Sequence, residues 1–304
     1  MAVTIKHLPH SEVEVAGEVS AQDLEGAWEK AVKEAVAETE LPGFRKGKAP
    51  GEMVTRKIGE DRLLHRAAEF ALGQAWPKAI EEAGVQAIGL PDIQILKLAR
   101  GNPLEWKARV AVLPEVVLPA YQDIARGMRA PLEKVLTGRA GFLEKSMEKD
   151  GKNENKTEKD SPERIKEKQR LTLLEAIATQ SSIELPAVLK EAEKIKMAQE
   201  LRAGLEAIGL KWEDYLAHIK KNEQEILDGF DGEADKRARF GLVLREIAKR
   251  EHIDPSPQEV EERVRQMLPA YAPEEQKHLD KNRLESYAYG IIRNGKVFEL
   301  LESL

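Results

Sequence analysis

The residues at positions 43–48, Gly-Phe-Arg-Lys-Gly-Lys, come closest in this sequence to a phosphate-binding motif. A nucleotide-binding loop of that kind needs four residues between its glycines and a Ser or Thr after its lysine, so that it wraps a phosphate and places a hydroxyl on magnesium. Here only three residues separate Gly43 from Gly47, and Ala49 follows Lys48. The spacing therefore argues against a nucleotide site.

The same segment has the composition of a docking loop. Two prolines and two glycines in ten residues predict a structured loop around Phe44, so little conformational entropy would be lost on contact with a partner. Residues 41–66 contain seven basic and three acidic side chains, a local net charge of +4 in a chain of net charge −6. Basic residues beside an aromatic side chain favour a phosphate-rich or acidic surface. The alternative is a solvated turn whose Phe44 folds back onto its own helices.

Motifs for catalysis or metal binding are missing from the sequence. His7 and His10 form a His-x-x-His pair without a third ligand, and the other four histidines are isolated. There is no His-Glu-x-x-His, Gly-x-Ser-x-Gly or Gly-x-Gly-x-x-Gly motif. The absence of cysteine excludes disulfides, Cys-ligated zinc and a Cys nucleophile. We therefore expect no enzyme activity, no metal and no cofactor.

Composition suggests the broad class of the protein. The 304 residues predict two domains, and the hydrophobic fraction of 41% is sufficient to form a core. Charged residues at 34% and aromatic residues at 5% favour long solvated helices over a dense β-sandwich. No apolar run approaches 18 residues, and the first residues show no export signal. We expect a cytoplasmic protein without a membrane partner.

Residues 1–113 are predicted to form a compact α+β domain. Alternating apolar and polar residues at 3–8 and 12–19 indicate a β-hairpin, and the same pattern returns at 92–98 and 104–112. Between these pairs, helical spacing predicts helices over 21–38, from Pro50 to Ile58, and over 60–83. The predicted element order is β-β-α-α-α-β-β.

The rest of the chain is predicted to be a linker and an all-α, multi-helix domain. Residues 114–160 form the linker: 114–130 look extended, 132–148 weakly helical, and 149–160 carry no aliphatic or aromatic residue. Residues 161–304 show only helical patterns. Seven helices are predicted there, spanning about 161–179, 186–208, 211–227, 233–250, 256–269, from 273, and from 282 towards the end.

The last helices carry apolar residues on more than one face. Packing between helices explains most of them. A partly open apolar cradle for other polypeptide chains is the functional alternative. The candidate cradle residues are Met267, Leu268, Tyr271, Tyr289 and Ile292.

Taken together, these features resemble the bacterial trigger factor family, chaperones of the ribosomal exit tunnel. The resemblance covers the β-β-α-α-α-β-β domain, the loop at 43–50 and the helical domain. It implies an ATP-independent chaperone that docks on ribosomal protein and RNA of the large subunit beside the tunnel and shields nascent or unfolded polypeptides. It also implies protein transport and cell division as associated processes, and a homodimer off the ribosome. The ribosome-binding residues would be Gly43, Phe44, Arg45, Lys46, Gly47, Lys48 and Pro50.

One departure from the family pattern bears on activity. The usual member carries an FKBP-type prolyl isomerase domain, which needs roughly a hundred residues. Residues 132–162 are too few, are rich in charged residues, and include Phe142 as their only aromatic. The sequence therefore resembles a shortened family member without that domain. A residual isomerase and an RNA-binding or assembly factor with a helical dimerisation domain remain as alternatives. The RNA-binding alternative calls for stacking aromatics along a basic face, and only Phe44 fits.

Overall fold

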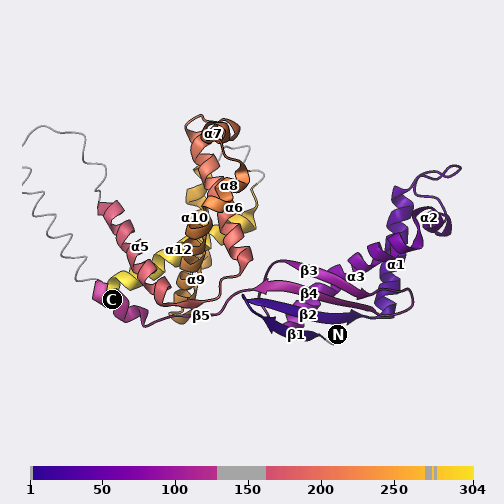
Figure 1. Ribbon diagram of the computed structural model, residues 1–304, viewed down its shortest axis with the longest axis horizontal. Helices are drawn as coiled ribbons and strands as arrows, with labels where there is room; N and C mark the ends of the chain where they lie inside the picture. The colour runs from indigo at the N-terminus through magenta and orange to yellow at the C-terminus, as the bar shows by residue number, and fades with distance from the viewer. Residues whose placement is uncertain (1–2, 129–161, 271–275, 277–278) are drawn as a thin grey trace, which may run out of the picture. The chain divides into compact units, whose positions relative to one another are not determined.

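The computed structural model describes residues 3–128, 162–270, 276 and 279–304 (Figure 1). The chain divides into two compact units. One comprises Met1–Glu115 with Glu184–Leu189, and the other Val116–Ile183 with Lys190–Leu304. The helix expected at 132–148 and the charged stretch at 149–160 lie outside the described residues.

The first unit is built on a four-stranded antiparallel sheet. Strands β1 (Thr4–Leu8), β2 (Glu12–Val19), β3 (Ala87–Lys97) and β4 (Leu104–Val112) lie in the order β1-β2-β4-β3. Helices α1 (Ala21–Glu38), α2 (Gly51–Ile58) and α3 (Glu60–Ala83) lie between β2 and β3 in the chain. The predicted β-β-α-α-α-β-β order is confirmed. Strand β3 begins earlier than predicted because a bulge between Ile88 and Asp92 breaks the alternation.

The core of the first unit lies between one face of the sheet and helices α1 and α3. The register pairs Gly17 on β2 with Trp106 on β4, and Trp106 is 1% exposed. Its indole makes an edge-to-face contact with Trp76 of α3, with ring centroids 6.1 Å apart. A Cβ atom at position 17 would lie 2.9 Å from Trp106 Cζ2, so the indole needs glycine opposite it. This packing fixes the sheet against the helices that carry the 41–50 loop.

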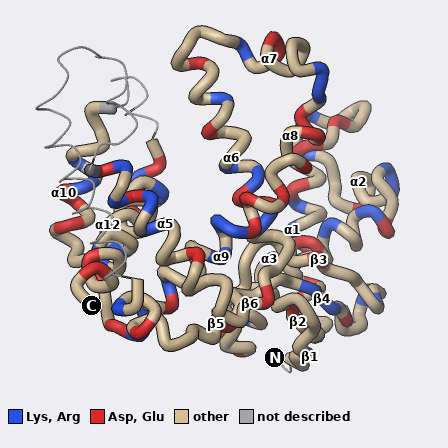
Figure 2. Tube along the Cα trace, turned by 60° about the vertical axis from the view of Figure 1, so that its left-hand side comes forward, with Lys and Arg blue, Asp and Glu red and all other residues tan. Residues whose placement is uncertain are grey.

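The second unit is helical apart from a short antiparallel pair, β5 (Val116–Val117) with β6 (Ser182–Ile183). Helix α9 packs against α5 and α12, and α10 packs against α12. In Figure 2, basic and acidic positions alternate along these helices. The helices are α5 (Pro162–Gln180), α6 (Ala187–Ala207), α7 (Trp212–Ile219), α8 (Glu223–Gly229), α9 (Asp231–Arg250), α10 (Pro257–Met267), the 3-10 turn η2 (Leu268–Ala270) and α12 (Lys281–Ser303).

Two parts of the second unit differ from the sequence-based expectation. Residues 121–128 are helical rather than extended, and Tyr121 and Ala125 on this helix are buried. The Tyr121 hydroxyl donates a hydrogen bond to Glu251, and burial is the main cause that raises the pKa of Tyr121 to about 12. This part of the expected linker is therefore packed structure. Proline at 114 and 119 hid the helix, because prolines usually mark extended or turn segments.

Helix boundaries account for the other differences. The single helix expected at 211–227 is split into α7 and α8, because Lys220 adopts a left-handed conformation (φ 54°). Asn222 then starts α8 with a capping box that includes Glu225. Asp280, rather than the expected Asn282, caps α12. Of the helix expected from residue 273, only Gln276 and residues from 279 onward are described.

Candidate functional site

The 41–50 loop connects α1 to α2 and is anchored at both ends. Figure 1 shows it as the coil that extends beyond α2. Leu41 is half-buried against the core and Ala49 is buried. Lys57 Nζ donates a 2.7 Å hydrogen bond to the carbonyl of Glu40, which connects α2 to the residue just before the loop. The residues between these anchors are therefore held by the helices on either side.

Two successive turns shape the exposed part of the loop. The Phe44 N–H donates to the Leu41 carbonyl, and the Lys48 N–H donates to the Arg45 carbonyl, each at 3.0 Å. Gly43 and Gly47 have φ values of 86° and 78°, in the left-handed region that glycine adopts without strain. The sequence pattern of two glycines separated by three residues is thus a double-turn signature rather than a phosphate cradle.

The loop presents an aromatic ring among cationic side chains. Phe44 is 39% exposed, so its ring is not buried against the helices behind it. Arg45, Lys46 and Lys48 are exposed, and within the described residues none of them forms an ion pair with a carboxylate. This arrangement favours the docking interpretation over a turn that folds back onto itself.

Neighbouring acids neutralise part of the basic excess that the sequence predicted. Arg66 forms ion pairs with Glu38 at 2.9 Å and Glu34 at 3.2 Å. The hydrogen bond to Arg66 is the main cause that lowers the pKa of Glu38, and the charge of Lys46 adds to it. Both acids lie on α1, outside the 41–66 window of the charge count. Arg66 therefore adds little to the positive charge near the loop, whereas Arg45, Lys46 and Lys48 form no ion pair among the described residues.

The loop can bind but offers no acid–base chemistry. Guanidinium and ammonium groups suit phosphate or carboxylate oxygens, and the Phe44 ring suits a small apolar recess. His7 and His10 lie in the β1–β2 hairpin. Across the part of the chain that the structure describes, no three His, Asp or Glu side chains are grouped to hold a metal ion. Nor does any described helix have the length and apolar character needed to span a bilayer.

The candidate cradle residues that the structure describes lie on α10, η2 and α12. Met267 at the end of α10 and Leu268 in η2 are half-buried, as is Ile292 on α12. Tyr289 is half-buried as well, and its hydroxyl donates a 2.7 Å hydrogen bond to Asp254. Tyr271 lies outside the described residues. Tyr289 also lines a pocket of about 630 Å³.

The sequence analysis missed a more exposed apolar surface at the end of α6. Ile208 is 77% exposed, and Leu210 is exposed after the left-handed Gly209. A pocket of about 410 Å³ beside them is lined by Leu210 and Trp212, and the Arg202 guanidinium lies 4.9 Å from the Trp212 ring. The signal for this surface was the Ile-Gly-Leu sequence at a helix end, where apolar side chains flank a turn instead of a core.

Comparison with protein families identifies the chain. The family model described as "Bacterial trigger factor protein (TF)" matches residues 1–129. The model described as "Bacterial trigger factor protein (TF) C-terminus" matches residues 148–302, about half of the chain. The protein belongs to the trigger factor family. The resemblance inferred from the loop and the element order is therefore confirmed.

Individual trigger factors match the chain to different extents. The trigger factor of Rhodococcus opacus (strain B4) is 35% identical over 125 residues, which cover 41% of this chain and 27% of that protein. Trigger factor 1 of Desulfitobacterium hafniense (strain Y51) is 36% identical over 124 residues, covering 41% and 29%. The chain thus spans less than a third of these two relatives. The trigger factor of Geobacillus thermodenitrificans (strain NG80-2) is 24% identical over 89% of this chain and 91% of that protein.

A solved structure shares the fold. It is described as "Promiscuous Substrate Recognition in Folding and Assembly Activities of the Trigger Factor Chaperone". The two structures match with a TM-score of 0.60 and 16% identity, over 100% of this chain and 99% of the other. The shared fold therefore extends over both units of the chain.

Proposed function

We propose that the protein is an ATP-independent chaperone that docks on the large ribosomal subunit beside the tunnel exit and holds unfolded or nascent polypeptides. The observation that carries the docking role is the double-turn loop of a trigger factor family member, which presents Phe44 among three cations that have no carboxylate partner in the described part of the chain. The partner surface would combine ribosomal RNA phosphates or acidic protein side chains with a small apolar recess.

The anchoring of the loop supports docking by a preformed surface. Both turns are closed by backbone hydrogen bonds, and Ala49 and Leu41 fix the ends. A loop that is already ordered loses little conformational entropy on binding, so a contact of few residues retains most of its interaction energy. The exposed side chains from Phe44 to Lys48 lie outside the core, so they can contact a partner without a cost in stability.

Exposed apolar side chains on the second unit support polypeptide binding. Ile195, Ile208, Leu210 and Tyr287 are each more than a third exposed, and charged residues lie between them. Burial of apolar surface contributes about 25 cal/mol per Å², and ordering of the bound chain offsets much of this. We expect weak, reversible binding, with affinities on the order of micromolar. Rapid release suits a holder whose client must leave in order to fold.

Ribosome co-sedimentation tests the docking role. The variant Phe44→Ala/Arg45→Ala/Lys46→Ala should keep the fold and lose ribosome binding at physiological salt. A matched control, Lys107→Ala/Arg109→Ala, removes two cations from the polar face of the sheet and should bind like the wild type. Raising the salt concentration should weaken wild-type binding because counterions return to the phosphates. Equal co-sedimentation of the loop variant and the wild type would disprove docking through this loop.

We further propose that the chain does not catalyse prolyl isomerisation. The two family matches leave residues 130–147 between them, far fewer than the roughly one hundred that an FKBP-type domain requires. The barrier to rotation of the peptide bond is about 18–20 kcal/mol, and lowering it calls for a cleft that desolvates the amide. A proline tetrapeptide should isomerise at the uncatalysed rate. Acceleration in proportion to protein concentration would contradict this proposal.

A further inference from the structure

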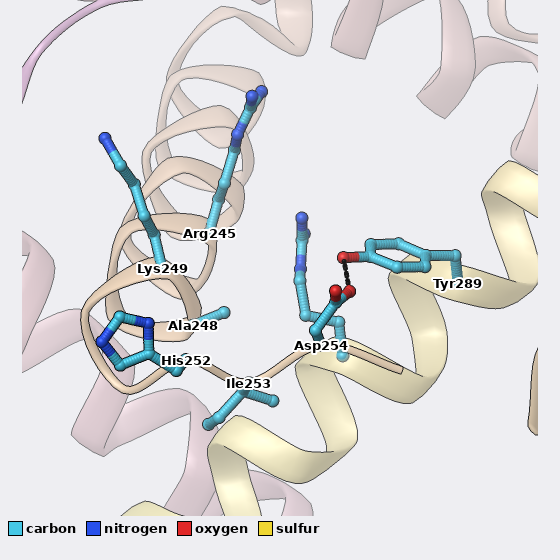
Figure 3. Close-up of a pocket in the computed structure, with 8 residues that line it drawn as sticks. Arg245, Ala248, Lys249, His252, Ile253, Asp254 and Tyr289 are labelled. Carbon is cyan, nitrogen blue, oxygen red and sulfur yellow. Dashed lines mark hydrogen bonds between the residues drawn. The ribbon is translucent and has the colours of Figure 1, made fainter. Parts of the chain in front are cut away.

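A cationic pocket lies within the second unit, between the end of α9 and the middle of α12. Its volume is about 630 Å³. Figure 3 shows the Arg245 and Lys249 side chains projecting in the same direction from α9, with Tyr289 facing Asp254. The residues that line the pocket include Arg245, Ala248, Lys249, Asp254, Tyr289 and Arg293.

The turn after α9 shapes the pocket. His252 adopts a left-handed conformation (φ 52°), uncommon for a residue with a side chain, and the Ile253 N–H donates a 2.8 Å hydrogen bond to the Ala248 carbonyl. The chain then runs toward α12, where Asp254 accepts a 2.7 Å hydrogen bond from the Tyr289 hydroxyl. This bond is the main cause that raises the pKa of Tyr289. The pocket is therefore defined by backbone geometry as well as by side chains.

Two of the cations that line the pocket, Arg293 and Lys249, form no ion pair among the described residues. The half-buried Arg293 donates hydrogen bonds to Asn294 Oδ1, and it forms no ion pair with any carboxylate among the described residues. Burial lowers the pKa of Arg293, and the nearby charge of Arg245 acts in the same direction. Within the described residues, Lys249 also lacks a carboxylate partner. The acid in the pocket, Asp254, is already bonded to Tyr289.

Helix electrostatics account for only one of these cations. A lysine in the last turn, such as Lys249, stabilises the negative end of the α9 dipole. Arg293 lies in the middle of α12, so the same explanation does not apply to it. Half-buried guanidinium groups are normally paired with acids, because removing the charge from water costs free energy. An anion bound in the pocket would therefore stabilise the Arg293 guanidinium.

We propose that this pocket binds carboxylate side chains of unfolded polypeptide clients, at acidic residues flanked by apolar ones. The Arg293 guanidinium and the Lys249 ammonium group would bind the carboxylate, while Ala248 and the Tyr289 ring would contact the neighbouring apolar side chain. The inference rests on the proposed chaperone function and adds a substrate preference to it. It also gives Tyr289 a role beside an anion site.

A nucleic-acid ligand fits the surroundings less well. Asp254 places a negative charge inside the pocket. Several phosphates of one chain would meet this charge as well as the cations. A single carboxylate on an otherwise apolar peptide avoids most of this repulsion.

Fluorescence anisotropy with the full chain tests the proposal. The probes are a labelled unfolded peptide with two glutamates among leucines, the same peptide with glutamines, and a single-stranded RNA of equal length. We expect the glutamate peptide to bind about three- to tenfold more tightly than the glutamine peptide at low salt, as a charge-assisted hydrogen bond at a half-exposed site provides. Arg293→Gln should remove this difference and leave binding of the glutamine peptide unchanged.

Two further variants make each outcome informative. Arg283→Gln makes the same chemical change on an exposed position of α12 and should preserve the difference between the peptides. If Arg293→Gln does not fold, Lys249→Gln on the exposed side of the pocket should reduce the difference.

Equal affinity of the wild type for both peptides would overturn the anion site while leaving the chaperone function intact. If neither the glutamate peptide nor the glutamine peptide binds, the result contradicts the chaperone function itself. RNA binding that is lost in Arg293→Gln would overturn the carboxylate assignment in favour of nucleic acid.

Discussion

The two units of the chain arrange their chemistry in opposite ways. The first unit packs β2, β4, α1 and α3 around Trp106 and displays a single short loop with two turns. The second unit distributes exposed apolar and charged side chains over several helices, with buried positions in between. A binding site for one fixed partner needs defined geometry, whereas a surface for many unfolded chains needs area and weak contacts. The proposed function assigns one of these tasks to each unit, and both tasks require side chains that lie outside the cores.

The largest expected effect is the loss of unfolding free energy when a buried side chain is removed from the core of either unit. Trp106→Ala should destabilise the first unit by about 3–5 kcal/mol, because a fully buried indole leaves a cavity opposite Gly17. Ile247→Ala, at a buried position of α9, should destabilise the second unit by about 2–5 kcal/mol. Urea unfolding followed by far-UV circular dichroism measures both. If each substitution lowers the midpoint of one transition only, the units unfold separately; one shared transition in both variants would contradict that separation.

The fold of the first unit was largely predictable from local signals. Period-two alternation located β2 and β4, and Ser20 at the start of α1 accepts the hydrogen bond that its capping role requires, from the Asp23 N–H at 3.1 Å. The loop was predictable too, because its glycines and prolines determine backbone conformation directly. The sequence did not show that Arg66 pairs with acids on α1, because Arg66 is 28 residues from Glu38 and 32 residues from Glu34.

The pocket in the second unit could not be found in the same way. Helical periodicity shows which face of a helix is apolar but not which helix lies against it. Arg245 and Arg293 come together because α9 packs against α12, and nothing local to either helix indicates this. The presence of apolar residues on more than one face of the last helix indicated Tyr289 as a candidate, but it did not reveal that the Tyr289 hydroxyl donates a hydrogen bond to Asp254. Long-range packing is therefore the information that the sequence analysis lacked.

A smaller effect should appear at the start of α10. Ser256 Oγ accepts from the Glu259 N–H while the Glu259 carboxylate accepts from the Ser256 N–H, a complete capping box. Ser256→Ala should lower the free energy of unfolding by about 1 kcal/mol. Asn282→Ala, one residue inside α12, should change it by less than about 0.5 kcal/mol, because Asp280 is the cap there. Similar losses in both variants would show that the assigned caps are wrong.

Lowering the pH should reveal how much Glu259 contributes to the stability of the fold. The hydrogen bond from Lys296 is the main cause that lowers the pKa of Glu259 from 4.5 to about 2. Because the folded-state pKa is the lower one, the stabilisation is fully present above pH 4.5 and is lost as the pH falls towards 2. Glu259→Gln should therefore flatten the fall in stability across this window in thermal melts. An unchanged pH dependence would show that the ion pair with Lys296 does not stabilise the fold.

The smallest expected effect sharpens the contrast between core and surface. Ile208→Ser/Leu210→Ser replaces exposed apolar side chains and should change the free energy of unfolding by no more than about 0.5 kcal/mol per site. A thermal melt compares this variant with the wild type. A loss as large as that of Ile247→Ala would mean that these residues belong to a core and not to a binding surface.

The division of roles between the two units is tested most directly by the aggregation of a chemically denatured client, diluted without ATP in the presence of the protein. The wild type and the loop variant Phe44→Ala/Arg45→Ala/Lys46→Ala should suppress aggregation equally at near-stoichiometric ratios, while Ile208→Ser/Leu210→Ser should suppress it less. Loss of suppression in the loop variant, with full activity in the Ile208/Leu210 variant, would contradict the account.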